Sequence, residues 1–421
     1  MTTPATAREA CERALAHTED ADTRSAMITV TAARARMEAD RSDQRRARGE
    51  LRSPLDGVPI VWKDLFDVAG TVTTCGSASF ADRPPAQVDG ALVRRAAALG
   101  MVTIGKTNLS EFAFSGLGIN QHFGTPVNPV DAALVPGGSS SGAAVAVATG
   151  IAPLAVGTDT SGSVRVPAAF SGCVGFRASH HRYGPNDFRE LSATLDSVGL
   201  MARTVAEIRT LDRLLAGATH EPATTTRRMI VPAGEWIDDC TDGVLRSFTA
   251  AVDALRAGGV TVTTERLASL QTAQDLIDAH GTIVGSDAYD TYGGLLSSAA
   301  DIEPATRRRL ERNRGARQAT GPLRSAMPSL RRQFADELAG ALLLCPTVRH
   351  EPPSIADLLA SDAAYDAVNA STLRTTMVLS YLGTCGVTLP TGLLISAPHG
   401  RDDVLLAVTA QLAPLTRCSS G

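Results

Sequence analysis

The order of hydrophobic and polar residues predicts alternating helices and strands along this chain. Residues 5–16 and 25–50 are rich in Ala, Arg and Glu and predict two helices, which end before the turn residues at 53–57. Residues 58–63 are rich in β-formers and predict a strand. The first part of the chain therefore predicts a helical segment followed by the first strand of a sheet.

The rest of the chain continues this alternation. Residues 89–100 predict a helix that Gly100 ends, residues 101–105 predict the next strand, and residues 221–228 predict an exposed connection. The remaining segments are an apolar one at 143–156, a polar one at 177–193, an α/β unit made of 228–234 and 260–267 around a helix, a charged helical one at 296–335, and strands at 341–347 and 387–396. We expect one large mixed β-sheet covered on both faces by α-helices.

Composition and charge narrow the class of protein. The 421 residues are 44% hydrophobic, which is enough for a large globular core, and the net charge of −4 gives no basic surface for nucleic acid or anionic lipid. The charged N-terminus and the lack of a long apolar run predict neither a signal peptide nor a membrane span. Seven widely spaced cysteines without a C-x-x-C pair predict buried, reduced thiols and no zinc site. We expect a cytoplasmic protein that uses no metal or other cofactor.

Residues 100–107, GMVTIGKT, match the phosphate-binding pattern G-x-x-x-x-G-K-[ST]. In such a loop the residues between the glycines form a tight nest of backbone N–H groups, whereas the apolar and β-branched residues here favour an extended strand. We therefore interpret Lys106 and Thr107 as the end of a strand.

Residues 138–142, GSSSG, match the nucleophile elbow of α/β-hydrolases, with Ser140 at the centre. The elbow needs a buried strand before it and a histidine base after it. Here Pro136 stands where that strand would end, and His399, the best-placed histidine, lies in a loop pattern typical of a solvated turn. We therefore favour another arrangement of the catalytic groups.

Three segments combine hydroxyl residues and glycines with a single lysine, at 57–64, 136–148 and 157–172. The two serine-rich loops flank a buried, hairpin-like apolar unit and can face each other. They lack a histidine, so a serine nucleophile there needs another base. Lys63 fits because its strand carries it into the interior, where desolvation lowers a lysine pKa. The alternative is an edge-strand Lys63 paired with Asp64.

Six segments resemble the amidase signature family, serine hydrolases that use a Ser-Ser-Lys triad. They occur in the family's order and spacing, and they are GVPIVWKD (57–64), GKTNLSEFAFSG (105–116), FGTPVNP (123–129), PGGSSSGAAVAVA (136–148), GTDTSGSVRVPAAFSGCVGF (157–176) and TLDSVGLMART (194–204). The resemblance implies the amidase signature fold in a single domain over 1–421. Its parts would be N-terminal helices (1–50), a core (57–204) and a second α/β part (205–421) that contributes pocket walls.

The resemblance also implies roles for individual residues. The family's lysine falls on Lys63, its bridging serine on Ser139 and its nucleophile on Ser163. The oxyanion hole then consists of backbone N–H groups in the loop before and at the nucleophile, those of Thr160, Ser161, Gly162 and Ser163. The hydroxyl-rich loop thus brings a nucleophile and several amide donors to one carbonyl group.

Further residues support this loop by resemblance. The bridging serine of the family follows a cis peptide bond, here Gly138–Ser139, and Asp159 and Arg165 would shape the loop by hydrogen bonding. Alternatively, Arg165 would contact an acidic substrate. The family often has Gly-Gly where this chain has Ser161-Gly162, so a positive φ at Ser161 would be strained. Strand alternation predicts that the ring of Trp62 points away from the lysine and packs in the core.

The implied reaction is hydrolysis of the C–N bond of a small carboxamide through an acyl-enzyme. The chain is short for the family and is most similar to compact amidases of the indoleacetamide hydrolase type, although residues 180–190 replace a shorter glycine-rich segment. An esterase or acyl-transferring relative, the glutaminase-type subunit of a tRNA amidotransferase and an inactive binding protein stay open as alternatives. We expect a small-molecule amide as substrate, no nucleic acid and no membrane as partner, and leave a homodimer open.

Overall fold

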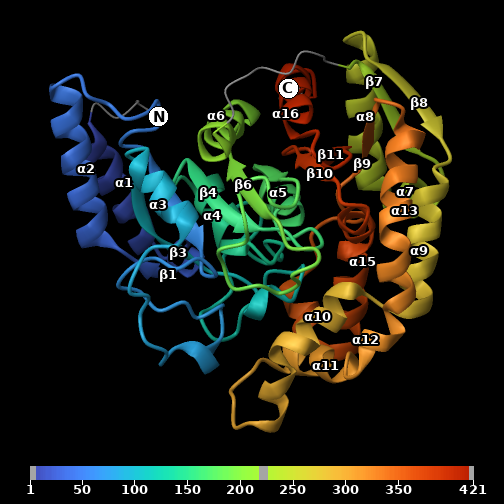
Figure 1. Ribbon diagram of the computed structural model, residues 1–421, viewed down its shortest axis with the longest axis horizontal. Helices are drawn as coiled ribbons and strands as arrows, with labels where there is room; N and C mark the ends of the chain where they lie inside the picture. The colour runs from blue at the N-terminus through green and yellow to red at the C-terminus, as the bar shows by residue number, and fades with distance from the viewer. Residues whose placement is uncertain (1–5, 218–225, 417–421) are drawn as a thin grey trace.

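The computed structural model describes residues 6–217 and 226–416 of the protein. The strands in these residues form one mixed sheet of eleven strands in the order β1-β3-β2-β4-β6-β5-β10-β11-β9-β7-β8 (Figure 1). The strands are β1 (Met27–Val30), β2 (Pro59–Lys63), β3 (Val102–Thr107), β4 (Leu154–Thr158), β5 (Val174–Arg177), β6 (Val198–Ala202), β7 (Arg228–Pro232), β8 (Thr261–Glu265), β9 (Leu342–Pro346), β10 (Cys385–Thr388) and β11 (Leu393–Ala397).

Helices cover both faces of this sheet, as expected from the sequence. The α-helices are α1 (Ala7–Glu19), α2 (Ala32–Ala47), α3 (Ala91–Ala98), α4 (Ser141–Thr149), α5 (Arg165–Ser171), α6 (Val205–Ala216), α7 (Glu235–Asp238), α8 (Asp242–Ala257), α9 (Ala268–His280), α10 (Ile283–Tyr292), α11 (Pro304–Arg312), α12 (Ala316–Ala319), α13 (Gly321–Leu338), α14 (Ile355–Ala360), α15 (Asp362–Tyr381) and α16 (Asp402–Leu412). Short 3₁₀ turns are η1 (Arg24–Ala26), η2 (Ala78–Phe80), η3 (Glu111–Ala113) and η4 (Gly293–Ser297).

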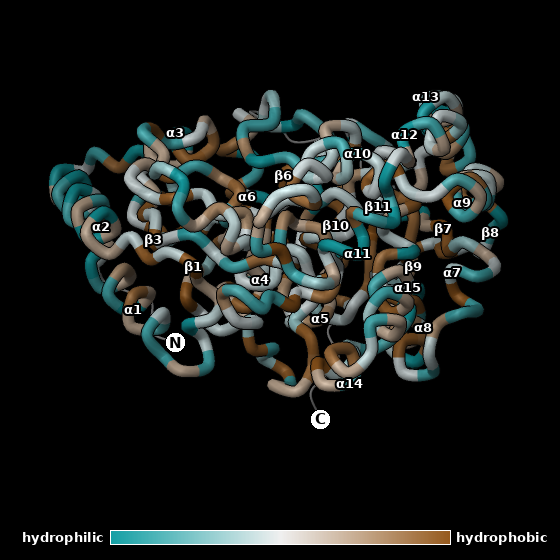
Figure 2. The backbone as a smooth tube through the Cα atoms, turned by 90° about the horizontal axis from the view of Figure 1, so that it is seen from below, coloured by the Kyte–Doolittle hydropathy of each residue, from teal (hydrophilic) through white to brown (hydrophobic). Residues whose placement is uncertain are grey.

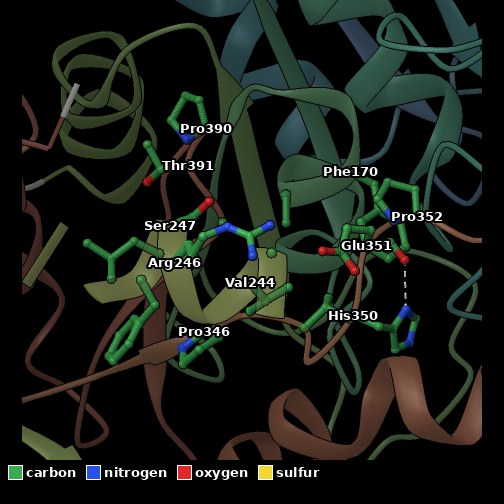
Figure 3. Close-up of a pocket in the computed structure, with 16 residues that line it drawn as sticks. Phe170, Val244, Arg246, Ser247, Pro346, His350, Glu351, Pro352, Pro390 and Thr391 are labelled. Carbon is green, nitrogen blue, oxygen red and sulfur yellow. Dashed lines mark hydrogen bonds between the residues drawn. The ribbon is translucent and has the colours of Figure 1, made fainter. Parts of the chain in front are cut away.

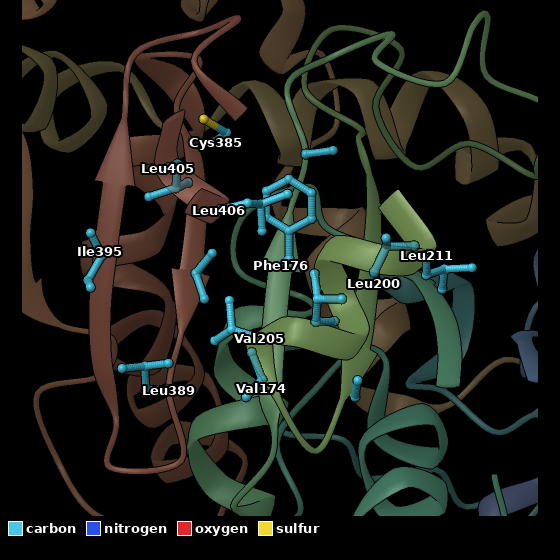
Figure 4. Close-up of a cluster of buried hydrophobic side chains, with 14 of the residues drawn as sticks. Val174, Phe176, Leu200, Val205, Leu211, Cys385, Leu389, Ile395, Leu405 and Leu406 are labelled. Atoms are coloured by element: carbon cyan, nitrogen blue, oxygen red, sulfur yellow. The ribbon is translucent and has the colours of Figure 1, made fainter. Parts of the chain in front are cut away.

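The alternation of side chains along each strand divides the core between the two faces. On β2, Ile60 and Trp62 pack with α3, α6 and α16, whereas Val61 packs on the other face with α1, α2 and α4. Figure 4 shows part of the first cluster, where Phe176 and Leu200 of neighbouring strands lie against Leu406 of α16. The outer helix α2 is mainly hydrophilic along its length (Figure 2). The next residue on β2, Lys63, therefore belongs to the face that α4 covers.

The N-terminal segment contains a strand where the sequence pattern predicted one helix over 25–50. Residues 27–30 form β1, which pairs antiparallel with β3 (Met27 opposite Thr107), and the helix begins only at Ala32. The segment Ile-Thr-Val is β-branched and favours a strand once a partner edge is available. The prediction was wrong because that partner lies about 75 residues further along the chain.

Most other predicted elements are present. The strand over 58–63 and the helix over 89–100 are confirmed, with Gly100 at φ +87° just after the helix. Lys106 and Thr107 end β3, so the phosphate-loop match is a strand. The α/β unit at 228–267 is confirmed as β7, α8 and β8. The exposed connection predicted at 221–228 lies mostly outside the described residues.

The buried unit between the two serine-rich loops is a helix followed by a strand, not a hairpin of strands. Every residue of α4 up to Val147 is buried, since the sequence SGAAVAVAT has small or apolar residues on all sides. Gly150 ends the helix in the left-handed region (φ 90°), and β4 then returns along it. The start of the helix and the end of the strand consequently lie at the same edge of the sheet, together with the end of β2, which runs parallel to β4.

Two expectations about the whole chain can be compared with the described residues. The six cysteines in this part are buried and form no disulfide, while Cys418 lies outside it. No helix in this part is long and apolar enough to cross a membrane.

Candidate active site

Lys63 is the last residue of β2, a strand in the interior of the sheet between β3 and β4. Its side chain is fully buried, and its Nζ donates hydrogen bonds to Ser139 Oγ at 2.7 Å and to Thr158 Oγ1 at 2.9 Å. Trp62, on the opposite face, packs its ring against Phe66, as the alternation predicted. The strand therefore delivers a single amine to the two hydroxyl-rich loops.

Lys63 makes no ion pair within the described residues. The adjacent carboxylate, that of Asp64, instead pairs with the buried Lys106, so the predicted alternative of a Lys63–Asp64 pair is wrong. Burial lowers the pKa of Lys63 from 10.5 to about 7, although the negative charges of Asp196 and Asp159 oppose the shift. A substantial fraction of this amine is therefore neutral near pH 7.

The loop that carries Ser139 is held against its neighbours by backbone hydrogen bonds. The peptide bond between Gly138 and Ser139 is cis. The carbonyl oxygen of Ser139 accepts a hydrogen bond from the N–H of Ser110 at 3.2 Å, and the N–H of Ser140 donates to the carbonyl oxygen of Ser163 at 3.0 Å. The two serine loops are therefore directly bonded to each other, and Ser163 lies beside the segment that holds Ser139.

The loop after β4 is wrapped around the carboxylate of Asp159. Its Oδ1 accepts from the N–H of Gly162 at 2.8 Å, and its Oδ2 accepts from the N–H of Val164 at 3.2 Å. Arg165 Nε and Nη2 each donate to this carboxylate at 2.9 Å, and Arg177 contacts it as well. Burial opposes ionisation of Asp159, but the two arginines outweigh it and lower its pKa well below the ordinary value. This buried charge cluster fixes the shape of the loop.

Arg165 has no exposed surface. Besides Asp159 it donates to the carbonyl oxygen of Thr376 at 3.1 Å and to Ser380 Oγ at 2.7 Å, both on α15. A side chain held in this way is not available to a bound molecule. The arrangement favours the interpretation in which Arg165 supports the loop over the one in which it contacts an acidic substrate.

The backbone amides of the loop differ in their availability. The N–H of Gly162 is taken by Asp159, whereas those of Thr160, Ser161 and Ser163 have no acceptor among the described residues. Gly162 has φ +133°, and a Cβ there would lie 2.2 Å from Thr376 Oγ1, so this position requires glycine. Ser161 lies outside the positive-φ region, so the strain considered for it does not arise. Three amides remain free to bind an oxyanion.

Asp196 is a member of this cluster that the sequence analysis did not single out. Its Oδ1 accepts from Thr160 Oγ1 at 2.5 Å, and its Oδ2 accepts from the N–H groups of Leu191 and Ser192. Burial raises its pKa to about 6. The signal was present in the segment TLDSVGLMART, since an acidic residue between apolar neighbours ahead of a buried strand must find donors.

The competing serine and histidine do not form a catalytic pair. Ser140 precedes α4, its Oγ donates to the carbonyl oxygen of Thr158 at 3.2 Å, and no strand comes before it. His399 is exposed and its ring contacts the carbonyl oxygen of His180 at 3.3 Å. Neither feature of a nucleophile elbow is present, since the strand is missing and the ring contacts a carbonyl.

A separate cavity of about 480 Å³ lies between α5, α8 and the turns after β9 and β10. Figure 3 shows Arg246 and Glu351 in it, on walls that also include Phe170 and Pro390. It is located near the end of β9, which runs antiparallel to β11, and thus at the edge of the sheet opposite the end of β4. None of the predicted site residues lines it.

Known proteins resemble this chain over most of its length. The model of the Amidase family matches residues 9–406. The 2-amino-5-chloromuconic acid deaminase of Comamonas testosteroni is 34% identical over 384 residues, which cover 87% of this chain and 81% of that protein. A subunit of the glutamyl-tRNA(Gln) amidotransferase of Cupriavidus necator is 40% identical over 255 residues, 61% of this chain, and this match spans about half (48%) of that protein.

Solved structures share the fold over nearly the full length. A crystal structure of an amidase has a TM-score of 0.85 at 27% identity and covers 97% of this chain and 96% of that one. The structure of 6-aminohexanoate cyclic dimer hydrolase with its substrate has a TM-score of 0.82 at 24% identity and covers 98% and 94%. The second likeness concerns the fold alone.

Proposed function

The chain belongs to the Amidase family, and we propose that it hydrolyses the C–N bond of a small carboxamide through an acyl-enzyme formed on Ser163. The observation that carries the proposal is the environment of Lys63, whose buried amine lies 2.7 Å from Ser139 Oγ and has no carboxylate partner among the described residues. A lysine in that state can serve as a base near neutral pH.

The proposed reaction begins with two proton transfers. The neutral amine of Lys63 takes a proton from Ser139, which takes one from Ser163, and Ser163 Oγ attacks the carbonyl carbon of the amide. The free N–H groups of Thr160 and Ser161 and that of Ser163 itself bind the oxyanion of the tetrahedral intermediate. This assignment leaves out Gly162, because its N–H already donates to Asp159.

The second half of the reaction reverses the relay. The proton held by Lys63 returns through Ser139 to the leaving nitrogen, so that the amine or ammonia departs as a neutral molecule and the acyl group stays on Ser163. Water then attacks the ester by the same path and releases the carboxylic acid. The charge cluster around Asp159 keeps the loop in shape throughout and exchanges no proton.

Labelling with a fluorophosphonate tests the nucleophile. The reagent should modify Ser163, as identified by peptide mass spectrometry, and Ser163→Ala should abolish both labelling and amide turnover. Ser140→Ala is the matched control, because it removes a neighbouring hydroxyl and should keep labelling. Modification of Ser140 in the Ser163→Ala variant would overturn the proposal in favour of a nucleophile elbow.

Two alternatives use the same groups. An esterase or acyl-transferring enzyme would differ in the group that leaves or accepts the acyl chain, and partition of the acyl-enzyme between water and added hydroxylamine distinguishes them. A role within a tRNA amidotransferase is favoured only by the match to the amidotransferase subunit, of which about half is spanned. Glutaminase activity that appears only with partner subunits would support it.

We also propose that residues 1–421 act as one amidase domain, since the family match extends over most of the chain. The part after residue 205 supplies α15, whose Thr376 Oγ1 donates to the carbonyl oxygen of Ser161 at 2.5 Å. A cytoplasmic location and a small-molecule substrate without nucleic acid are further parts of this proposal.

A further inference from the structure

Arg309 lies on the inner face of α11, four residues after the buried Ala305 and next to the buried Leu310. Its guanidinium carbon is 4.0 Å from the centre of the Phe114 ring, and the side chain as a whole is half-buried. A charged side chain on an inward helical face that stacks on an aromatic ring is held in a defined direction.

This guanidinium has no hydrogen-bond or ion-pair partner among the described residues. Its neighbours on the outer side of the helix, Arg308 and Arg312, both reach Asp366, at 3.5 and 2.6 Å. Burial lowers the pKa of Arg309 to about 10, so it is still charged at neutral pH. Its nitrogens are also absent from the fully buried unpaired atoms, which shows that they border accessible space. A desolvated charge of this kind is costly unless an anion binds to it.

Phe114 connects Arg309 to the catalytic loop. The next residues, Ser115 and Gly116, contact the loop directly, because the carbonyl oxygen of Gly116 accepts from the N–H of Gly138 at 2.7 Å. A Cβ at Gly138 would lie 2.8 Å from the carbonyl oxygen of Ser115. The aromatic ring that carries the guanidinium is therefore one residue away from the segment that packs on Gly138 and Ser139.

Helix α15 continues this wall to the nucleophile loop. Ser115 Oγ is 3.0 Å from Tyr365 Oη and donates to Asn369 Oδ1 at 3.0 Å, and the N–H of Gly116 donates to the same oxygen. Further along the helix, Thr376 contacts Ser161. Asn369 uses only its oxygen in these bonds, so its Nδ2 donors have no acceptor within the described residues. Arg309 and Asn369 thus add unused donors to the wall between α11 and the site.

We propose that Arg309 binds a carboxylate of the substrate, so that the preferred substrates are amides that carry a carboxylate remote from the scissile C–N bond. The inference rests on the proposed function, because it places the amide at Ser163. It moves the acidic-substrate contact from Arg165, which is buried and paired, to an arginine that is unpaired. The planar guanidinium suits this role because it can donate two parallel hydrogen bonds to one carboxylate.

The test compares amides that differ only in the carboxylate. The probes are malonamate, succinamate, glutaramate and adipamate, each paired with the neutral amide in which a methyl group replaces the carboxylate (propionamide, butyramide, valeramide and hexanamide). For each pair the ratio of kcat/KM for the acid to kcat/KM for the neutral amide is measured. We expect a ratio well above one for at least one chain length, which would also report the distance from Arg309 to the reacting carbonyl.

Substitution then assigns the ratio to one side chain. In Arg309→Met the ratio should fall by about 30- to 100-fold, which corresponds to the loss of a charge-assisted hydrogen-bonded pair. Arg308→Met is the matched control on the same helix and should change the ratio less than about twofold. Arg309→Lys keeps the charge without the fork and should give an intermediate ratio, and it serves if the methionine variant does not fold.

The outcomes distinguish this inference from the proposed function. If wild type turns over neutral amides at least as well as the acids, or if the ratio survives in both Arg309 variants, this inference is wrong while the proposed function stands. If no amide is hydrolysed and fluorophosphonate leaves Ser163 unmodified, the proposed function fails and the carboxylate site falls with it.

Discussion

The pKa of Lys63 makes the strongest demand on the proposed mechanism, and a pH profile tests it. A lysine with its ordinary pKa of 10.5 would be neutral in only about 0.03% of molecules at pH 7. With burial lowering the pKa to about 7, half of the molecules carry the neutral base at that pH, and about a tenth do so at pH 6. The active form is the deprotonated one, so activity is lost as the pH falls through the folded-state value.

The assay is kcat/KM for a neutral amide from pH 5.5 to 9.5 at constant ionic strength, followed by ammonia release. We expect an acidic limb with an apparent pKa near 7, then a plateau into alkaline pH. The apparent value belongs to Lys63, Ser139 and Ser163 together, because they share protons. Lys63→Ala should remove the limb and lower the rate by orders of magnitude, whereas His399→Ala should leave both in place. A profile that rises tenfold per pH unit up to pH 9.5 would show a solvated lysine and refute the proton path.

Three further predictions concern the stability of the site, each measured by urea unfolding. Because the pKa of Lys63 is lower in the folded than in the unfolded chain, wild type should gain about 2 kcal/mol of unfolding free energy relative to Lys63→Met between pH 7 and 9, and equal pH dependence of the two proteins would contradict this. Asp159→Asn should cost about 3–5 kcal/mol, since it leaves Arg165 and Arg177 buried without a counter-charge, and a loss below 1 kcal/mol would argue against the charge cluster. Gly162→Ala should destabilise by more than about 2 kcal/mol and exceed the loss in the control Gly172→Ala, where φ is also positive but no atom lies within 4 Å of the added Cβ.

The core of the site was predictable because it depends on short segments of the chain. A run of apolar β-formers that ends in a lysine predicts a buried amine, and a helix-forming apolar segment between two glycine-rich loops predicts that both loops meet. Both conditions are local. The observed bond between Lys63 and Ser139 follows from them once β2 and β4 are neighbours in the sheet.

What the sequence did not predict depends on partners far away in the chain. Residues 27–30 form a strand only because the edge of β3 is free to pair with them, and the local pattern had indicated a helix. Arg309 belongs to a segment with many arginines, and its sequence neighbours give no sign that it alone turns toward Phe114. Which charge in a polar helix faces inward is decided by the packing of α11 on α15, which no window of sequence contains.

The pairing of the two buried lysines explains how the chain keeps one of them neutral. Lys106 and Lys63 end adjacent parallel strands, with Trp62 opposite Lys106 in the register, and one carboxylate lies between them in the sequence. Asp64 turns to Lys106 and also accepts from the N–H of Thr74 at 3.0 Å, so its charge is used at the structural lysine. Lys63 is left with hydroxyl and carbonyl oxygens, which bond an amine without requiring it to be charged. Had Asp64 paired with Lys63 instead, the attraction would have favoured the ammonium form and removed the base that the serines need.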